Sequence, residues 1–466
     1  MDKIIYNANI YTMDDTNPQC QAIAIIGDTI IKTGTNADIL KLKTDKTELI
    51  DLQNKTVLPG FNDSHLHIFS TGRLLSRVNL LNTTSIKETL NRLKIATTND
   101  NKWLIGQGWN QDYFDEARFI NKSDLDSVST TQPILIYRAC GHVAVVNSKA
   151  LEVAGITSNT SSPSGGKFTL DSGLFEENAI DLITEHIPDF TYEEVKDILL
   201  QGMKYANSNG ITSVQSDDMR GNYETIIKAY QDLESKNLLT CRIYEQNLLP
   251  IGKTLKSFIN DGYYTGFGSK YFKIGPLKLL ADGSLGARTA ALRSPYNDDL
   301  STTGILTYTD KELYELVELA HTNNIQIAIH AIGDKAIEQV LNQYENVLTK
   351  FPKDNHRHGV IHCQITDINL INRFKELNII AYVQPIFIHY DHKIVYNRVK
   401  DELANSSYAF KSMIDKGITT ILGTDCPVED LNPFNNIYCA VTRKDLTGKP
   451  EAGYNPNEAL SVYEAI

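Results

Sequence analysis

Short apolar runs separated by turn residues occupy the first 57 positions of the chain. They read IIYNANIYTM, AIAIIGDTIIKTGT and ELIDLQNKTVLP, and Asn, Asp and Gly divide them. Apolar runs of this length broken by such residues are typical of strands joined by turns. We therefore predict a small antiparallel β domain over residues 1–57.

From Pro59 onward, apolar strands alternate with helical segments. Helix-forming runs such as 311–324 and 335–350 lie between them. This alternation is typical of a parallel sheet built from βαβ units, and eight strands are the number that closes a (β/α)8 barrel. We predict an α/β fold with such a TIM-type barrel over residues 58–466. The eight predicted strands are 57–65, 134–142, 211–218, 272–283, 325–334, 358–364, 379–385 and 419–426.

Two gaps between the predicted strands are too long for simple connections. They cover about 70–133 and 151–200, and we predict that both carry inserted structure over the barrel mouth, where such barrels build their pockets. The first gap holds Trp103, Trp109, Tyr113 and Phe114. These side chains either face an apolar or aromatic group of a substrate or form the core of the insert.

The composition narrows the class of partner. The 466 residues carry a net charge of −12, which argues against binding to the nucleic acid backbone. The N-terminus lacks a basic segment leading into an apolar one, and no apolar run approaches the length of a membrane span. Six cysteines without CxxC spacing indicate neither a disulfide framework nor a zinc finger. We expect a cytoplasmic protein with a small-molecule substrate and no membrane partner.

The first candidate metal ligands are His65 and His67, which follow an apolar run and a Pro-Gly break. In an extended segment the period of two places both imidazoles on one face, close enough to share an ion. The alternative is a chance pair, since a second HxH occurs at His356 and His358. The first pair differs because it ends its predicted strand, whereas the second precedes one.

Further candidates fall at the carboxyl ends of other predicted strands. These are Lys278 on the fourth strand, His330 on the fifth, His362 on the sixth and Asp425 on the eighth. Each alone has a simpler explanation, such as a core histidine, a lysine reaching solvent or an aspartate in a turn. Together with His65 and His67 they meet at the face where barrel enzymes place their active sites. The convergence predicts a metal site.

Lys278 and Asp425 suggest specific chemistry. A lysine buried within GPLKLL would have a lowered pKa and act as a nucleophile, able to add CO2 and become a carbamate that bridges two metals. A carboxylate such as Asp425 near a metal-bound water can accept its proton during attack and return that proton to the leaving group.

The segments GFNDSHLH, LKLLADGSLGARTAAL, IAIHAIGD, HGVIHCQ and GTDCPVE occur in this order. With them the chain resembles the amidohydrolase superfamily, and more narrowly its family 3 branch, which includes N-substituted formamide deformylases. The resemblance extends from near the N-terminus to the last residue, and DGSLGARTA is quite specific to the branch. It also covers GWNQDYF (108–114) and RACGHVAVVNSKAL (138–151).

The resemblance implies a zinc-type centre with one or two ions, for which manganese and iron are alternatives. His65 and His67 would bind one ion, His330 and His362 the other, and a carboxylated Lys278 would bridge them. Asp425 would be both ligand and proton shuttle. The implied reaction is hydrolysis of a non-peptide C–N bond in a small amide, N-substituted formamide or cyclic amide by metal-activated hydroxide. His142 would polarise the carbonyl, and we expect Trp109 and Asp282 as further substrate contacts.

Two other functions stay open. The same metals could activate water against an ester or phosphoester, or the protein could bind metal without catalysis. The second alternative arises because family members usually return after the eighth barrel unit to complete the small β domain, and we find no such strands after the barrel. Either the chain is shortened or another chain covers the exposed edges, for example in a homodimer.

Overall fold

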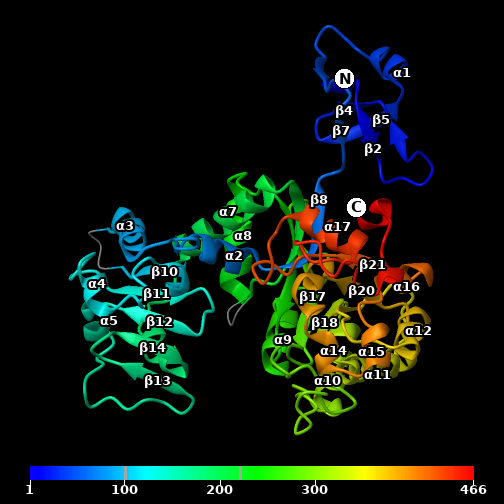
Figure 1. The fold of residues 1–466 in the computed structure, drawn as a ribbon. Coiled ribbons are helices and arrows are strands. Elements are labelled where there is room, and N and C mark those ends of the chain that lie inside the picture. Colours follow the sequence, from blue (N-terminus) through cyan, green and yellow to red (C-terminus); the bar gives the residue numbers. More distant parts are fainter. Residues whose placement is uncertain (99–101, 220–222) are drawn as a thin grey trace. The chain divides into compact units, whose positions relative to one another are not determined.

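The computed structural model describes residues 1–98, 102–219 and 223–466. Its largest sheet has eight strands, and each hydrogen-bonded neighbour pair is parallel (Figure 1). Together with the helices that follow the strands, this sheet confirms the predicted (β/α)8 barrel. In sheet order the strands are β8 (Phe61–Leu66), β15 (Ile211–Ser216), β16 (Arg242–Leu248), β17 (Phe272–Leu280), β18 (Ile327–Ala331), β19 (Gly359–His362), β20 (Ile380–Val383) and β21 (Thr420–Leu422).

One predicted barrel strand is wrong. Residues 134–142 contain β11 (Ile134–Arg138), which pairs with β10 and β12 in a separate sheet. The third barrel strand is instead β16, whose sequence RIYEQNL was not predicted as a strand. Polar residues interrupt its apolar pattern. One of them, Gln246, contacts His65 in the site described below.

The barrel closes between β8 and β21 through hydrogen bonds at their carboxyl ends. The Asp425 amide donates to the His65 carbonyl at 2.7 Å. The buried Asp63 carboxylate accepts from the Thr424 amide at 3.1 Å and from the Thr424 hydroxyl at 2.7 Å. A Cβ on Gly423 would lie 2.7 Å from the His65 backbone nitrogen, so this approach requires glycine. The seam therefore places the residues after β21 directly against the end of β8.

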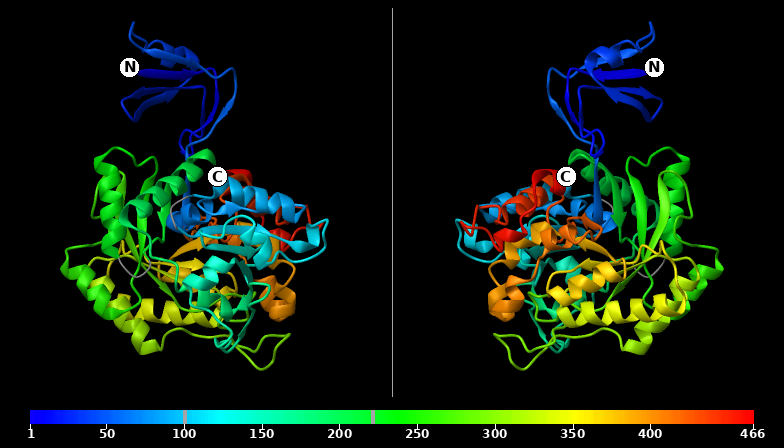
Figure 2. Two further views of the ribbon diagram at one scale, coloured as in Figure 1. Left: turned by 90° about the vertical axis from the view of Figure 1, so that its left-hand side faces the viewer. Right: turned by 90° about the vertical axis from the view of Figure 1, so that its right-hand side faces the viewer.

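The helices of the barrel are amphipathic. The predicted helices 311–324 and 335–350 correspond to α10 (Asp310–Thr322) and α11 (Asp334–Lys350), which pack side by side, in yellow-green and yellow in Figure 2. Thr309 and Glu312 form a capping box at the start of α10. The others are α9 (Gly252–Asn260), α12 (Ile368–Glu376), α13 (Ile388–Asp391), α14 (Val395–Arg398), α15 (Asp401–Asn405), α16 (Phe410–Asp415), α17 (Pro433–Thr442) and α18 (Val462–Ala465), with single turns η3 (Pro385–Phe387) and η4 (Pro456–Glu458).

The N-terminal strands form two small sheets. One has the order β5 (Thr29–Gly34), β4 (Ala22–Ile26), β1 (Lys3–Tyr6), β6 (Glu48–Asp51), and the other β3 (Gln19–Cys20), β2 (Asn9–Tyr11), β7 (Thr56–Val57). The prediction of a purely antiparallel sheet is wrong, because β6 pairs with β1 and β7 with β2 in parallel. The chain reaches these parallel positions by a long connection that includes α1 (Asn36–Leu40), which packs on β1 and β4.

The chain divides into two compact units. One contains Met1–Leu66 with the barrel strands β15 to β21, and the other contains His67–Tyr205 with α8 (Tyr223–Ser235). The second unit thus includes not only the two predicted insertions but also the strands between them. None of the described helices is both long and apolar enough to cross a lipid bilayer.

The second unit is built on a mixed six-stranded sheet with the order β13-β14-β12-β11-β10-β9. Its core includes Leu80, Trp109, Phe114 and Ile136. Its strands are β9 (Val78–Asn79), β10 (Leu104–Trp109), β11, β12 (Val143–Val146), β13 (Gly166–Thr169) and β14 (Leu174–Glu177). Its helices include α2 (Ile68–Leu75), α3 (Ile86–Ala96), α4 (Lys122–Asp126), α5 (Ser148–Val153), α6 (Asp181–Thr184) and most of α7 (Tyr192–Ser208), with turns η1 (Gln111–Tyr113) and η2 (Asn178–Ile180).

Candidate metal centre

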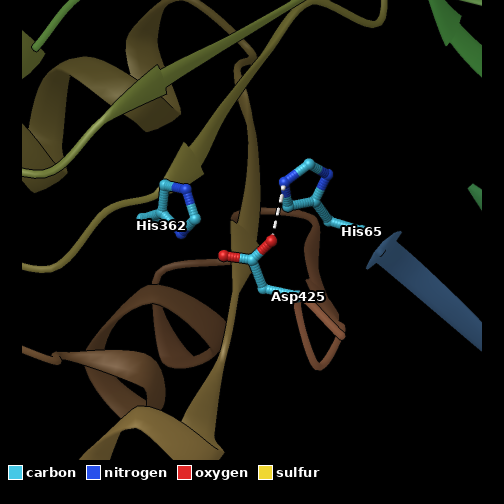
Figure 3. A group of neighbouring side chains, drawn as sticks. All are labelled: His65, His362 and Asp425. Atoms are coloured by element: carbon cyan, nitrogen blue, oxygen red, sulfur yellow. Dashed lines mark ion pairs between the residues drawn. The ribbon is translucent and has the colours of Figure 1, made fainter. Parts of the chain in front are cut away.

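Three buried side chains meet at the carboxyl end of the barrel: His65 at the end of β8, His362 at the end of β19 and Asp425 after β21 (Figure 3). One ligand atom from each lies within 4.8 Å of the others. His65 Nε2 is 3.4 Å from Asp425 Oδ1, and the two imidazole centroids are 5.7 Å apart. Two imidazoles and a carboxylate at such spacing can hold one divalent ion.

The backbone at two of these residues lies in the left-handed region. His362 has φ +80° and Asp425 has φ +60°, and Cys363 follows with φ +50°. Each such non-glycine residue costs about 1–3 kcal/mol and persists only where neighbours impose it. For Asp425 the neighbour is His65, whose carbonyl accepts its amide. The fold therefore holds these residues in a strained backbone conformation that brings their side chains to the cluster.

Glutamine side chains fix the orientation of both imidazoles. Nδ1 of His65 is 2.7 Å from Oε1 of Gln246, whose amide nitrogen donates to the Ser64 carbonyl at 3.1 Å. Because the glutamine oxygen can only accept, Nδ1 carries the proton and Nε2 keeps its lone pair toward Asp425.

His362 repeats this arrangement with Gln384, at 2.9 Å from Nδ1 to Oε1. Burial, with nearby His330 as a smaller cause, holds the pKa of His362 well below its usual value. The imidazole is therefore neutral at pH 7, as a metal ligand must be.

Lys278 lies inside the same cluster. It is buried on β17, and its Nζ is 3.2 Å from His65 Nε2. Burial lowers the pKa of Lys278, while the charges of Asp217 and Asp425 oppose this effect. The structure thus brings the lysine to the site, and its carboxylation stays a prediction.

His330 lies beside His362, with ring centroids 4.4 Å apart. Its Nε2 is 3.0 Å from the Gly283 carbonyl and 3.3 Å from Asp282 Oδ1. Since a carbonyl can only accept, Nε2 carries the proton and Nδ1 is the nitrogen left for an ion. Within the described residues, the three-ligand group around His65 does not include His330.

His67 has a different position from the one that the period of two implies. β8 ends at Leu66, so His67 falls outside the strand and becomes the N-cap of α2. It is the first residue of the second unit and is partly buried. The three-ligand group found among the described residues does not include it, and its role as a ligand stays a prediction.

The three residues expected to contact the substrate differ in exposure and in their neighbours. His142 lies between β11 and β12, with a side chain 70% exposed and Nδ1 2.9 Å from Glu177 Oε2. Trp109 is fully buried in the core of the second unit, and its indole N–H lies 3.4 Å from the Ile136 carbonyl. This placement favours the alternative for Trp109, a core residue of the insert. Asp282 is buried after β17.

The sequence predictions missed the two glutamines. Gln246 lies in the unpredicted strand β16, and Gln384 directly follows β20. A polar residue inside or at the end of an otherwise apolar barrel strand was the only available signal.

A family model described as "Amidohydrolase family" matches residues 48–466. The chain belongs to this family. This amidohydrolase is 34% identical over 478 residues to "Putative amidohydrolase YtcJ" of Bacillus subtilis (strain 168), with 100% of this chain and 88% of the relative covered. It is 23% identical over 502 residues to the N-substituted formamide deformylase of Arthrobacter pascens, with 100% of this chain and 87% of the relative covered.

A solved structure shares the fold of this amidohydrolase along nearly its whole length. It is an uncharacterized metal-dependent hydrolase from Pyrococcus furiosus, with a TM-score of 0.81, 29% sequence identity and coverage of 99% of this chain and 92% of that chain. The chain is thus a member of a group of metal-dependent hydrolases. Its donor set fits a divalent ion, because two neutral imidazoles present Nε2 beside a carboxylate and a buried amine.

Proposed function

We propose that this amidohydrolase hydrolyses a non-peptide C–N bond of a small amide, with His65, His362 and Asp425 holding a divalent ion. The observation that carries the proposal is the buried group of these three side chains beside Lys278 at the end of the barrel where such folds place their active sites. Zinc is the proposed ion, since imidazole and carboxylate donors suit it, and manganese and iron accept similar donors.

A bound divalent ion would supply Lewis acidity, which polarises a carbonyl and makes a water molecule more acidic. Asp425 would accept the proton of the attacking water and then donate it to the leaving nitrogen. The amide-to-carbonyl bond from Asp425 to His65 and the seam at Asp63 hold the carboxylate in place for both steps. Gln246 and Gln384 keep the imidazoles in the tautomer that leaves Nε2 unprotonated.

Lys278 has a separate proposed role. Its neutral amine would attack CO2, forming an N–C bond and releasing one proton, so that the side chain becomes an anionic carbamate. The lowered pKa of the buried lysine favours the neutral amine that this reaction needs. The carbamate would supply an anionic ligand shared by two ions, and His67 and His330 are further proposed ligands.

N-substituted formamides and cyclic amides are the proposed substrate classes. Support comes from the full-length similarity to an N-substituted formamide deformylase. His142 would polarise the substrate carbonyl, as an exposed imidazole oriented by Glu177.

A substrate panel on metal-loaded protein tests the reaction. It compares N-substituted formamides, hydantoin-like rings, lactones and phosphotriesters, with wild type beside His65→Ala and Asp425→Asn. We expect turnover of a formamide or cyclic amide by wild type and its loss in both variants. His186→Ala changes an exposed histidine of the second unit and should retain nearly full activity. Turnover of phosphotriesters alone, or equal loss in all three variants, would overturn the assignment.

A further inference from the structure

The Asp282 carboxylate accepts hydrogen bonds from backbone amides of two loops. Its Oδ1 accepts from Ile332 at 3.0 Å, and its Oδ2 accepts from Ala291 at 2.9 Å and Gly333 at 2.8 Å. The side chain is completely buried. A buried carboxylate with three amide donors is fully solvated by the protein, so little capacity remains for a substrate.

The two loops that Asp282 joins both border the site. Ala291 lies in the segment after β17, the strand of Lys278, whereas Ile332 and Gly333 follow β18, the strand of His330. A Cβ on Gly333 would collide with the Ala291 backbone, so the loops are in close contact here. The Lys335 amide adds a further bond to the Ala291 carbonyl at 3.1 Å.

The same carboxylate reaches a predicted metal ligand. Oδ1 of Asp282 is 3.3 Å from Nε2 of His330, and the Gly283 carbonyl next to it is 3.0 Å from that nitrogen. The Ala281 amide also donates to the His330 carbonyl at 2.9 Å. The segment 281–283 therefore holds both the backbone and the outer ring nitrogen of His330.

We propose that Asp282 is a positioning residue: it joins the loops after β17 and β18 and fixes the ring of His330 so that Nδ1 is the nitrogen available to an ion. This inference rests on the proposed metal-dependent function, and it replaces the expected substrate contact at Asp282. Asp282 acts through His330 and touches neither substrate nor the reacting atoms.

The hydrogen-bond pattern makes Asp282→Asn a sharp test. Each carboxylate oxygen accepts at least one amide, so either orientation of an asparagine places its NH2 group against a backbone N–H. Asp334→Asn is the matched control. Asp334 is also buried and also binds the 281–293 segment, but its Oδ1 accepts both amides, from Arg293 and Lys335, at 3.0 Å. Asparagine can keep that oxygen.

The experiment measures metal stoichiometry by elemental analysis, metal affinity by chelator competition with Zn²⁺, and steady-state kinetics on the same preparations. For Asp282→Asn we expect the affinity of the ion near His330 to fall about 10–100-fold, as for other residues that orient metal ligands. The value of kcat should fall with it, while KM changes little. Asp334→Asn should keep the wild-type affinity.

Wild-type metal affinity in Asp282→Asn, or an equal loss in Asp334→Asn, would overturn the proposal. Metal binding decides this outcome even if no amide is turned over, so a failure of the proposed function stays distinguishable. If Asp282→Asn does not fold, hydrogen exchange on metal-free wild type gives the answer. We expect the amides of Ala291, Ile332 and Gly333 to be protected without metal, and protection only after metal addition would exclude Asp282 as the group that fixes the loops.

Discussion

The side-chain oxygen of Gln246 lies 2.7 Å from Nδ1 of His65, although 181 positions separate the two residues. Both side chains are buried at the carboxyl end of the barrel, and Gln246 is itself oriented by the Ser64 carbonyl. The contact decides which imidazole nitrogen carries the proton, and hence which one faces Asp425 and Lys278. A histidine without this acceptor would lose that preference.

Removal of this acceptor should lower the metal affinity more than it lowers the stability of the fold. In Gln246→Ala, Nδ1–H of His65 loses its partner and the ring loses its fixed orientation, so we expect a 10–100-fold lower metal affinity. Chelator competition with Zn²⁺ measures it, and urea unfolding monitors stability. Gln339→Ala removes another buried glutamine, on α11, whose amide donates to the Tyr308 carbonyl. Equal metal affinities in the two variants would contradict the orienting role.

Lys278→Ala tests the carbamate. We expect loss of activity and of part of the bound metal, because the proposed bridge disappears, and partial recovery of both with short-chain carboxylic acids that occupy its place. Elemental analysis and activity assays with and without acetate measure this. Lys273→Ala is the control, since Lys273 is exposed on the same strand β17. Full two-metal content in Lys278→Ala would exclude a bridge.

The barrel seam gives a prediction about stability. Thr424→Val removes the hydroxyl that donates to the buried Asp63 carboxylate at 2.7 Å. The loss of a hydrogen bond to a buried charged or polar group should lower the free energy of unfolding by about 1–3 kcal/mol. Urea denaturation measures it. Thr420→Val on β21 is the comparison, because within the described part of the chain the Thr420 hydroxyl donates only to the Ile418 carbonyl. A loss as large there would argue against a special role for the seam.

The fold could be predicted because barrel strands are apolar and the helices between them are periodic. The errors have two physical causes. An apolar run such as 134–138 shows that a strand is buried but not which sheet it joins. Conversely, β16 carries Gln246 toward the site, so its pattern is too polar to be recognised.

The candidate site could be predicted where a candidate ligand lies at the end of a strand. His65, His362, Lys278 and Asp425 were found because parallel strands bring their carboxyl ends together. The glutamines and the loop-joining role of Asp282 were not, since nothing local in the sequence pairs Gln246 with His65 or Asp282 with Gly333. The period of two does not extend to His67, because β8 ends one residue before it.

The second HxH has a structural setting at the opposite end of β19. His358 Nδ1 accepts the Ile327 amide at 3.1 Å, so its Nε2–H donates to His321 Nδ1 at 2.8 Å. His321 in turn donates to the Phe351 carbonyl, and His356 donates to that of Leu377. His356 Nδ1 accepts the His358 amide at 2.9 Å, so every ring nitrogen of the three histidines forms a hydrogen bond in the neutral form. Protonation of any of these rings would point its second N–H at another hydrogen-bond donor.

This histidine network should make the protein less stable in acid. Burial is the largest cause that lowers the pKa of His321, His356 and His358, and neighbouring histidines or Lys353 add to it. Unfolded histidines titrate near 6.5, so the contribution is fully present above that pH and is lost as the pH falls below it. Burial also raises the pKa of Asp63 to about 7, which acts in the opposite direction. Only a comparison with a variant therefore isolates the contribution of the histidines to the pH dependence of stability.

Urea unfolding of wild type and His358→Asn between pH 7.5 and pH 5 makes that comparison. Asparagine can still accept the Ile327 amide but does not titrate, so wild type should lose more stability than the variant as the pH falls below about 6.5. The difference should be about 1.4 kcal/mol for each unit by which the pKa of the folded histidine lies below its unfolded value, within the pH range covered. His186→Asn, at an exposed histidine, should follow wild type. Parallel pH profiles for wild type and His358→Asn would mean that the network tolerates protonation, and the neutral assignment of its rings would then be wrong.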